Sequence, residues 1–107
     1  MTTNSTWPTS VQPLLKLLVD DAARRAAVPA ERLRVASVQA VTWPDGALGC
    51  PQPGMLYTQA LVPGWRVTIE VPASGPLLYH ASQRGRWVWC QPERATPPAP
   101  ATPEQGT

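Results

Sequence analysis

The two cysteines and the single histidine are the side chains with the widest range of chemistry in this chain. Cys50 and Cys90 are its only cysteines, and His80 is its only histidine. They could form a disulfide, a metal site completed by Asp45, or a Cys50–His80 nucleophile pair. Structural zinc sites usually contain Cys-x-x-Cys spacing, which the chain lacks. A reactive thiolate needs a cation or helix N-terminus beside it, whereas Cys50 stands between a glycine and a proline. No metal, cofactor or catalytic residue is therefore expected.

The state of Cys50 and Cys90 depends on the compartment. A disulfide is favoured in an exported protein, and two buried free thiols fit a reducing compartment equally well. In either state we expect the two residues to lie close in space. Loop 43–54 and the end of the last predicted strand should meet at the same end of the sheet.

His80 has no partner that the sequence defines. A general base needs a nucleophile or an orienting carboxylate within hydrogen-bond reach. Ser82 and Glu70 could share its face of a sheet, but their spacing does not require it. A polar residue on a sheet face is the simpler interpretation, so the protein is predicted to be non-enzymatic.

Loop 43–54 is the most specific segment of the sequence, with three prolines and three glycines in twelve residues. Proline fixes φ and glycine permits positive φ, so the loop is expected to follow an ordered path. It is either a rigid connection between strands or a preformed binding surface. The candidate binding residues are Trp43, Asp45, Leu48 and Gln52. Asp45 is also expected to cap loop amides, and Leu48 to be either a plug into the core or a partner contact.

These residues must be positioned by one helix and a set of short strands. The helix is predicted over residues 10–27, with Ser10 as N-cap. Its apolar stripe contains Leu14, Leu15, Leu18, Val19, Ala22 and Ala26. Asp20 with Arg24, and Asp21 with Arg25, are expected to form ion pairs on the solvated face.

The remainder of the chain alternates with the period of strands. Strands are predicted over residues 33–42, 55–62, 65–71, 77–82 and 87–90, with a bulge near Ser37 and a turn at Pro63-Gly64. The predicted core consists of Leu14, Leu18, Ala22, Val35, Val41, Tyr57, Val67, Ile69, Leu77, Tyr79 and Trp87. The expected fold is α+β, with one N-terminal helix packed on a four- to five-stranded antiparallel meander. Residues 1–9 are predicted to be flexible, 10–91 to form the domain, and 92–107 to be a disordered Pro-rich tail.

Charge and hydropathy set limits on the partners. The net charge of +2 is spread along the chain, without the basic stripe of a nucleic-acid binder. Nucleic-acid contacts, if any, would involve Arg66, Arg84 and Arg86 beside Trp87 and Trp89. No apolar run reaches the eighteen or so residues of a membrane span, so no membrane association is expected. As given, the chain is expected to be cytoplasmic, or exported if an upstream signal has been removed, and the compartment stays open.

The chain resembles a small uncharacterised bacterial domain family over roughly residues 28–90. The family loop reads Trp-Pro-Asp-x-x-Leu-Gly-Cys-Pro-x-Pro-Gly. The matching residues here are Trp43, Pro44, Asp45, Leu48, Gly49, Cys50, Pro51, Pro53, Gly54, Tyr57, Gln59, Gly64, Tyr79, His80 and Cys90. The resemblance implies one domain and assigns no activity. The order of helix and strands is also similar to cystatin-like and PepSY-like folds, and architecture alone does not fix function.

The sequence therefore predicts a small non-enzymatic domain that binds an unidentified protein or peptide through loop 43–54 or a sheet edge. A protease inhibitor of cystatin-like architecture is the first alternative, although no Gln-x-Val-x-Gly segment is present. A nucleic-acid-binding protein is the second alternative.

Overall fold

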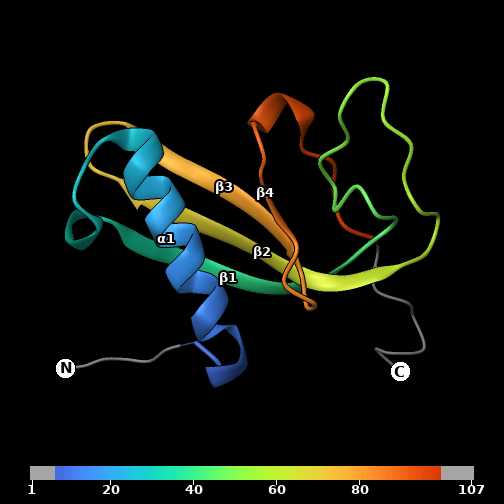
Figure 1. The fold of residues 1–107 in the computed structure, drawn as a ribbon, viewed down its shortest axis with the longest axis horizontal. Helices are drawn as coiled ribbons and strands as arrows, with labels where there is room; N and C mark the ends of the chain where they lie inside the picture. Colours follow the sequence, from blue (N-terminus) through green and yellow to red (C-terminus); the bar gives the residue numbers. More distant parts are fainter. Residues whose placement is uncertain (1–6, 100–107) are drawn as a thin grey trace.

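The computed structural model describes residues 7–99, so the segments 1–6 and 100–107 of the predicted flexible ends lie outside the described residues. Figure 1 shows one helix crossing a curved sheet, with a long loop at the end of the sheet that the helix does not cover. The elements in chain order are η1 (Thr9–Val11), α1 (Gln12–Ala26), η2 (Ala30–Arg32), β1 (Arg34–Trp43), β2 (Val62–Val71), β3 (Gly75–Ser82), β4 (Trp87–Trp89) and η3 (Pro92–Arg94).

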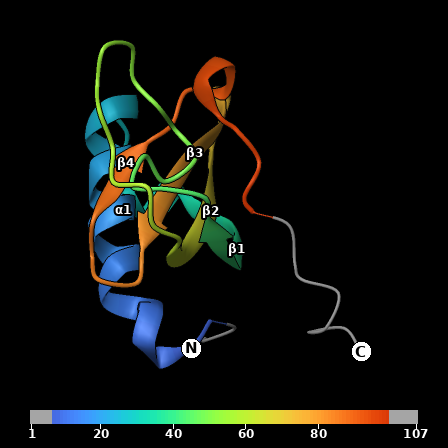
Figure 2. The same cartoon turned by 90° about the vertical axis from the view of Figure 1, so that its right-hand side faces the viewer.

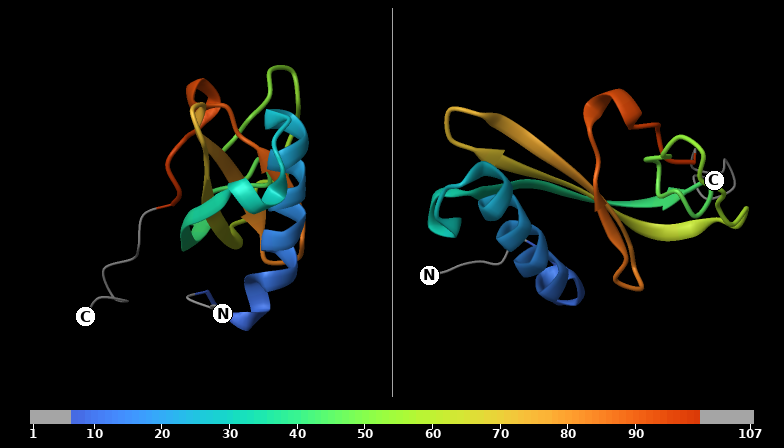
Figure 3. Two further views of the ribbon diagram at one scale, coloured as in Figure 1. Left: turned by 90° about the vertical axis from the view of Figure 1, so that its left-hand side faces the viewer. Right: turned by 45° about the horizontal axis from the view of Figure 1, so that its top comes forward.

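The four strands form one antiparallel meander in the order β1-β2-β3-β4. Helix α1 covers one face of this sheet, as Figure 3 shows from two further directions. The predicted α+β fold is confirmed. The expected bulge in the first strand is also present, as a register shift between Val35 and Ser37.

Helix α1 begins after a short 3-10 turn and not at a capping serine. Ser10 lies inside η1, and the N-cap is Val11, which makes no side-chain cap hydrogen bond. The predicted Ser10 cap is therefore wrong, because the chain already turns at Thr9. The helix ends where Ala27 adopts a left-handed conformation with φ 58°, and its N–H donates to the carbonyl of Ala23.

The main core lies between α1 and the sheet. Its buried side chains are Val11, Leu14, Leu15, Leu18, Ala22, Val67, Ile69, Tyr79 and Ala81. Trp7, Val35, Leu77 and Trp87 are half-buried against them. Two predicted core residues lie elsewhere, since Val41 faces the opposite side of the sheet and Tyr57 belongs to the loop. Alternation along the strands therefore places this core on the helix side only.

The observed bounds of β2 contradict two predictions. Residues 55–61 form no strand, and Pro63 and Gly64 lie inside β2, paired with Thr42 and Val41. Pro63 is tolerated as the second residue of the strand, where its carbonyl accepts a hydrogen bond from the Gln83 amide at 2.9 Å. Residues 55–61 instead belong to the exposed part of the loop that leads into β2.

The chain after β4 is ordered further than expected. Residues 92–94 form η3, the Thr96 amide donates to the Gly49 carbonyl, and the Ala99 amide donates to the Thr42 carbonyl, both at 2.8 Å. The expected disorder from residue 92 is therefore wrong for residues 92–99. Figure 2 shows this segment, coloured red, on the side of the sheet away from α1.

Candidate functional site

The first half of the long loop, residues 44–50, folds onto the sheet face opposite α1. Ala47, Leu48 and Cys50 are buried, and Leu48 is only 1% exposed. The Leu48 carbonyl lies 2.7 Å from Nδ1 of His80. Because a carbonyl can only accept, Nδ1 carries the proton. Leu48 is therefore a plug into a second, smaller core.

Trp43 is the largest side chain of this second core. Its ring stacks on His80 with centroids 4.3 Å apart, and its Nε1 donates to the Ala81 carbonyl at 3.0 Å. Gly64 and Gly49 both lie against the Trp43 ring, and a Cβ at either glycine would overlap its neighbours. Gly49 also has φ +70°, which few other residues adopt without strain. These two glycines thus make the space that holds Trp43.

A disulfide closes the loop onto the end of the sheet. Cys50 and Cys90 are bonded, with Cα atoms 5.8 Å apart, so the two residues do lie close in space. Cys50 therefore carries no free thiol for the Cys50–His80 nucleophile pair considered above. The C-terminal segment 92–99 crosses this loop through the Thr96–Gly49 hydrogen bond.

His80 is held neutral by its surroundings. It is 1% exposed, and burial lowers its pKa below the usual 6.5. The Leu48 carbonyl opposes this shift, and the positive charge of Arg66 adds to it. Within the described residues, Nε2 of His80 has no hydrogen-bond partner. The partners considered for general-base chemistry are engaged elsewhere, because the Ser82 hydroxyl accepts from the Arg86 amide and Glu70 pairs with Arg34.

The described structure contains no cluster of side chains suited to metal coordination. Across residues 7–99, no three His, Cys, Asp or Glu side chains gather where they could hold one ion.

The second half of the loop, residues 51–61, is exposed. Met55 is 59% exposed, Leu56 96% and Leu61 66%. Three hydrogen bonds define its course: the Gln52 amide donates to the Tyr57 hydroxyl at 3.0 Å, the Gly46 amide to the Thr58 carbonyl at 2.8 Å, and the Met55 amide to the Gln52 carbonyl at 3.2 Å. We call Met55, Leu56 and Leu61 the apolar loop residues.

A cleft of about 520 Å³ lies between this segment and the β3–β4 turn. One wall carries Leu61 and Pro63, and the other carries Ser82, Arg84 and Arg86. The walls are joined directly, since the Gln83 amide donates to the Pro63 carbonyl. This hydrogen bond holds the β3–β4 turn beside the start of β2. We call it the arginine cleft.

The four residues predicted to form a binding loop are thus separated. Trp43 and Leu48 are buried, and Asp45 accepts a hydrogen bond from the Ala47 amide at 2.9 Å, as its expected capping role requires. Gln52 is exposed. The sequence did not single out Met55, Leu56 or Leu61, because residues 55–62 read as a strand whose apolar side chains would be buried.

The residues proposed for nucleic-acid contact are also separated. Trp87 and Trp89 lie on the helix side, where Trp87 meets Tyr79 edge-on and the Arg25 guanidinium covers Trp89. Arg66 pairs across the sheet with His80 and points to the other face, bonded to Gln39. No single platform of tryptophan and arginine results.

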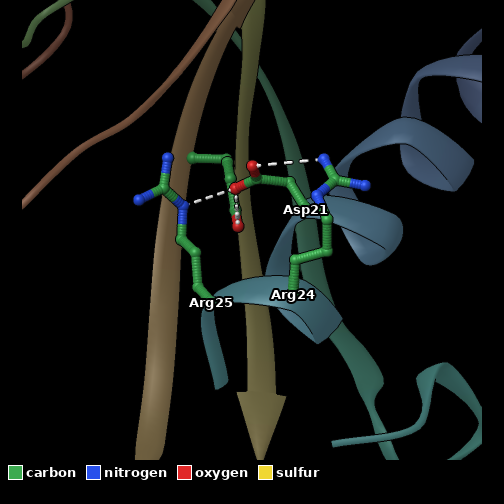
Figure 4. A network of polar contacts seen from close by, with 4 residues as sticks. Asp21, Arg24 and Arg25 are labelled. Carbon is green, nitrogen blue, oxygen red and sulfur yellow. Dashed lines mark hydrogen bonds and ion pairs between the residues drawn. The ribbon is translucent and has the colours of Figure 1, made fainter. Parts of the chain in front are cut away.

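A buried polar network links α1 to β3 (Figure 4). Asp21 is 8% exposed, and its carboxylate accepts hydrogen bonds from the Tyr79 hydroxyl at 2.7 Å and Arg25 at 2.5 Å. Arg24 lies 3.6 Å from its other oxygen. Burial would raise the pKa of Asp21, but these hydrogen bonds and charges lower it below the usual 3.8. The predicted Asp21–Arg25 ion pair is present, but its expected solvated position is wrong for Asp21, whose spacing seven residues after Leu14 places it on the apolar stripe.

Within residues 7–99, no helix has both the length and the apolar character that crossing a bilayer requires. No curated protein and no solved structure matches the chain. A family model described as a domain of unknown function, DUF8738, matches residues 15–90, from α1 to the second cysteine of the disulfide. The matched region includes the sheet, the plugged loop and the arginine cleft, and the chain belongs to this family, DUF8738.

Proposed function

We propose that this domain is a non-enzymatic protein- or peptide-binding module whose contact surface is the exposed half of the long loop. The observation that supports it is the distribution of exposed apolar side chains. Four large hydrophobic residues are exposed among those described, and three of them, Met55, Leu56 and Leu61, fall within seven residues of one loop. Apolar groups gathered on a surface mark interaction sites more often than scattered ones.

The loop that carries these residues is anchored at both ends. The Leu48 plug and the Cys50–Cys90 disulfide fix its beginning, and β2 fixes its end. Anchoring lowers the entropy that a partner must overcome when it orders the segment. The proposal therefore moves the binding surface from loop 43–54 as a whole to residues 51–61, which keep Gln52 and leave out the buried Trp43 and Leu48. We also propose that the protein is bacterial and that the loop pattern Trp-Pro-Asp-x-x-Leu-Gly-Cys-Pro-x-Pro-Gly is characteristic of its family.

The arrangement of residues gives less support to a protease inhibitor or to a nucleic-acid-binding protein. A cystatin-like inhibitor would insert a loop into a protease cleft, and the most distinctive residues of this loop, Trp43 and Leu48, are packed inside the domain. A nucleic-acid platform would need Trp87, Trp89 and Arg66 on one face, and they lie on two.

Site-specific photocrosslinking tests the proposal. Benzoylphenylalanine placed at Leu56, in the full chain expressed in its own host, should capture a discrete protein that mass spectrometry identifies. The matched control is benzoylphenylalanine at Leu17, an exposed leucine on α1 that is 51% exposed. The purified partner should then bind wild type and lose about tenfold or more in affinity for a Met55→Asp/Leu56→Asp variant. Equal capture at both positions, or none at Leu56, would contradict the proposal.

A further inference from the structure

We infer that the arginine cleft binds an acidic segment of a partner polypeptide, with a carboxylate between Arg84 and Arg86 and an apolar side chain against Leu61 and Pro63. The inference rests on the proposed function and adds the chemistry of the partner. Leu61 connects the two, because it is 66% exposed and lines the cleft.

The charge of the cleft carries the inference. Both charged side chains in its lining are arginines, and the lining contains no Asp or Glu. Within residues 7–99, the salt bridges involve Arg24, Arg25 and Arg34, and neither Arg84 nor Arg86 takes part in one. Two guanidinium groups without a counter-charge in the described structure favour an anionic ligand. Guanidinium binds carboxylates well because its N–H groups match the spacing of the two oxygens.

Arg86 is already positioned for this role. Its Nη2 donates to the Gly46 carbonyl at 3.2 Å, and its backbone amide donates to the Ser82 hydroxyl at 3.1 Å. The first bond holds the side chain across the cleft, the second holds the backbone of the turn, and other N–H groups of the guanidinium are left to a ligand. Less conformational entropy is then lost when a carboxylate binds.

A polypeptide fits the cleft better than a nucleic acid does. Single-stranded nucleic acids bind through aromatic stacking and several simultaneous phosphate contacts. The lining has two arginines and no aromatic residue, and its remaining side chains are mostly small or apolar, such as Ala60, Leu61 and Val62. Its volume of about 520 Å³ accommodates a few side chains of a peptide.

Selection from a phage-displayed library of random peptides of about twelve residues, on the folded full chain, tests the inference. Enriched peptides should carry Asp or Glu within about three residues of an apolar side chain. A synthetic copy of an enriched peptide should bind about tenfold more weakly to Arg84→Glu. Arg32→Glu is the matched control, because Arg32 is exposed, undergoes the same charge change and lies in η2, outside the cleft lining. It should change the affinity less than about twofold. A peptide with Lys in place of its acidic residue should regain affinity for Arg84→Glu.

Three results would overturn the inference. The first result is that the enriched peptides lack acidic residues, or that their affinity is unchanged by Arg84→Glu but lost with Met55→Asp/Leu56→Asp. It would contradict an acidic partner at the cleft and would leave the proposed function intact. The second result is that no peptide is enriched on the folded protein, which would contradict peptide binding at the cleft. Crosslinking at Leu56 would still test the proposed function separately. Arg84-dependent binding of a labelled single- or double-stranded oligonucleotide of about twenty nucleotides, at low micromolar protein, would assign the cleft to nucleic acid.

Discussion

Replacing Leu48 tests whether the first half of the loop is a structural plug. Leu48 is 1% exposed and its carbonyl holds His80, so Leu48→Ala removes buried apolar volume in a region fixed by the nearby disulfide. Buried Leu→Ala changes typically cost about 2–5 kcal/mol, with the lower values where the site can collapse. This second core lies near the end of the sheet, so we expect a loss of about 2–3 kcal/mol in the free energy of unfolding.

The backbone of Leu48 supplies an internal comparison. Its φ is +57°, a left-handed conformation that costs a residue with a Cβ roughly 1–2 kcal/mol. Glycine avoids that cost but loses about 0.5–1 kcal/mol of chain entropy on folding. Leu48→Gly should therefore be as stable as Leu48→Ala, or up to about 1.5 kcal/mol more stable. At an ordinary buried position with negative φ, glycine would be the less stable of the two.

Urea unfolding of the oxidised protein, followed by tryptophan fluorescence, measures both variants. The dependence on urea should keep the wild-type slope, so that midpoints report stability. A loss below about 1 kcal/mol for Leu48→Ala would show that the side chain does not act as a plug. A Leu48→Gly variant clearly less stable than Leu48→Ala would refute the backbone part of the reasoning.

Three further predictions concern the same end of the molecule. A double cysteine-to-serine variant should lose about 3–4 kcal/mol, the loop entropy expected for a separation of 40 residues, and an unchanged urea midpoint would contradict this. The pKa of His80 lies below 6.5 in the folded state, so on acidification the unfolded state binds the proton first, and the free energy of unfolding should fall as the pH falls below about 6.5. His80→Gln should abolish this dependence between about pH 5 and 7, because the chain has no other histidine. Truncation after Gln91 should cost about 1–2 kcal/mol, because it removes the hydrogen bonds of the segment 92–99 to the loop and β1, and a variant with wild-type thermal stability would show that those contacts contribute nothing.

The sequence allowed the fold to be predicted where local pattern and tertiary packing agree. The apolar stripe of α1, the alternation after Trp65 and the bulge near Ser37 all follow from backbone periodicity. Each of them is present in the structure. The clustering of prolines and glycines likewise predicted an ordered loop, and it contains the fixed turn around Gly49.

The errors came from positions where tertiary contacts decide. Residues 55–61 alternate like a strand, but they belong to no strand of the described structure, and the apolar side chains of Met55, Leu56 and Leu61 remain exposed. Asp21 reads as a surface charge because the sequence does not reveal that the Tyr79 hydroxyl needs a buried acceptor. The sheet is covered on both faces at one end, so Tyr79 and His80 are both buried although they alternate. A one-sided sheet would expose one of them.

Mapping peptide contacts by NMR tests the central claim most directly, that the exposed half of the loop and the arginine cleft form one binding surface. Uniformly ¹⁵N-labelled protein would be titrated with an acidic peptide obtained from the selection. The account predicts shifts concentrated in the amides of Met55, Leu56, Leu61 and Arg84, with the buried Leu48 amide little changed. Shifts concentrated on α1 or along the free edge of β1, with residues 55–61 and 82–86 unaffected, would contradict it.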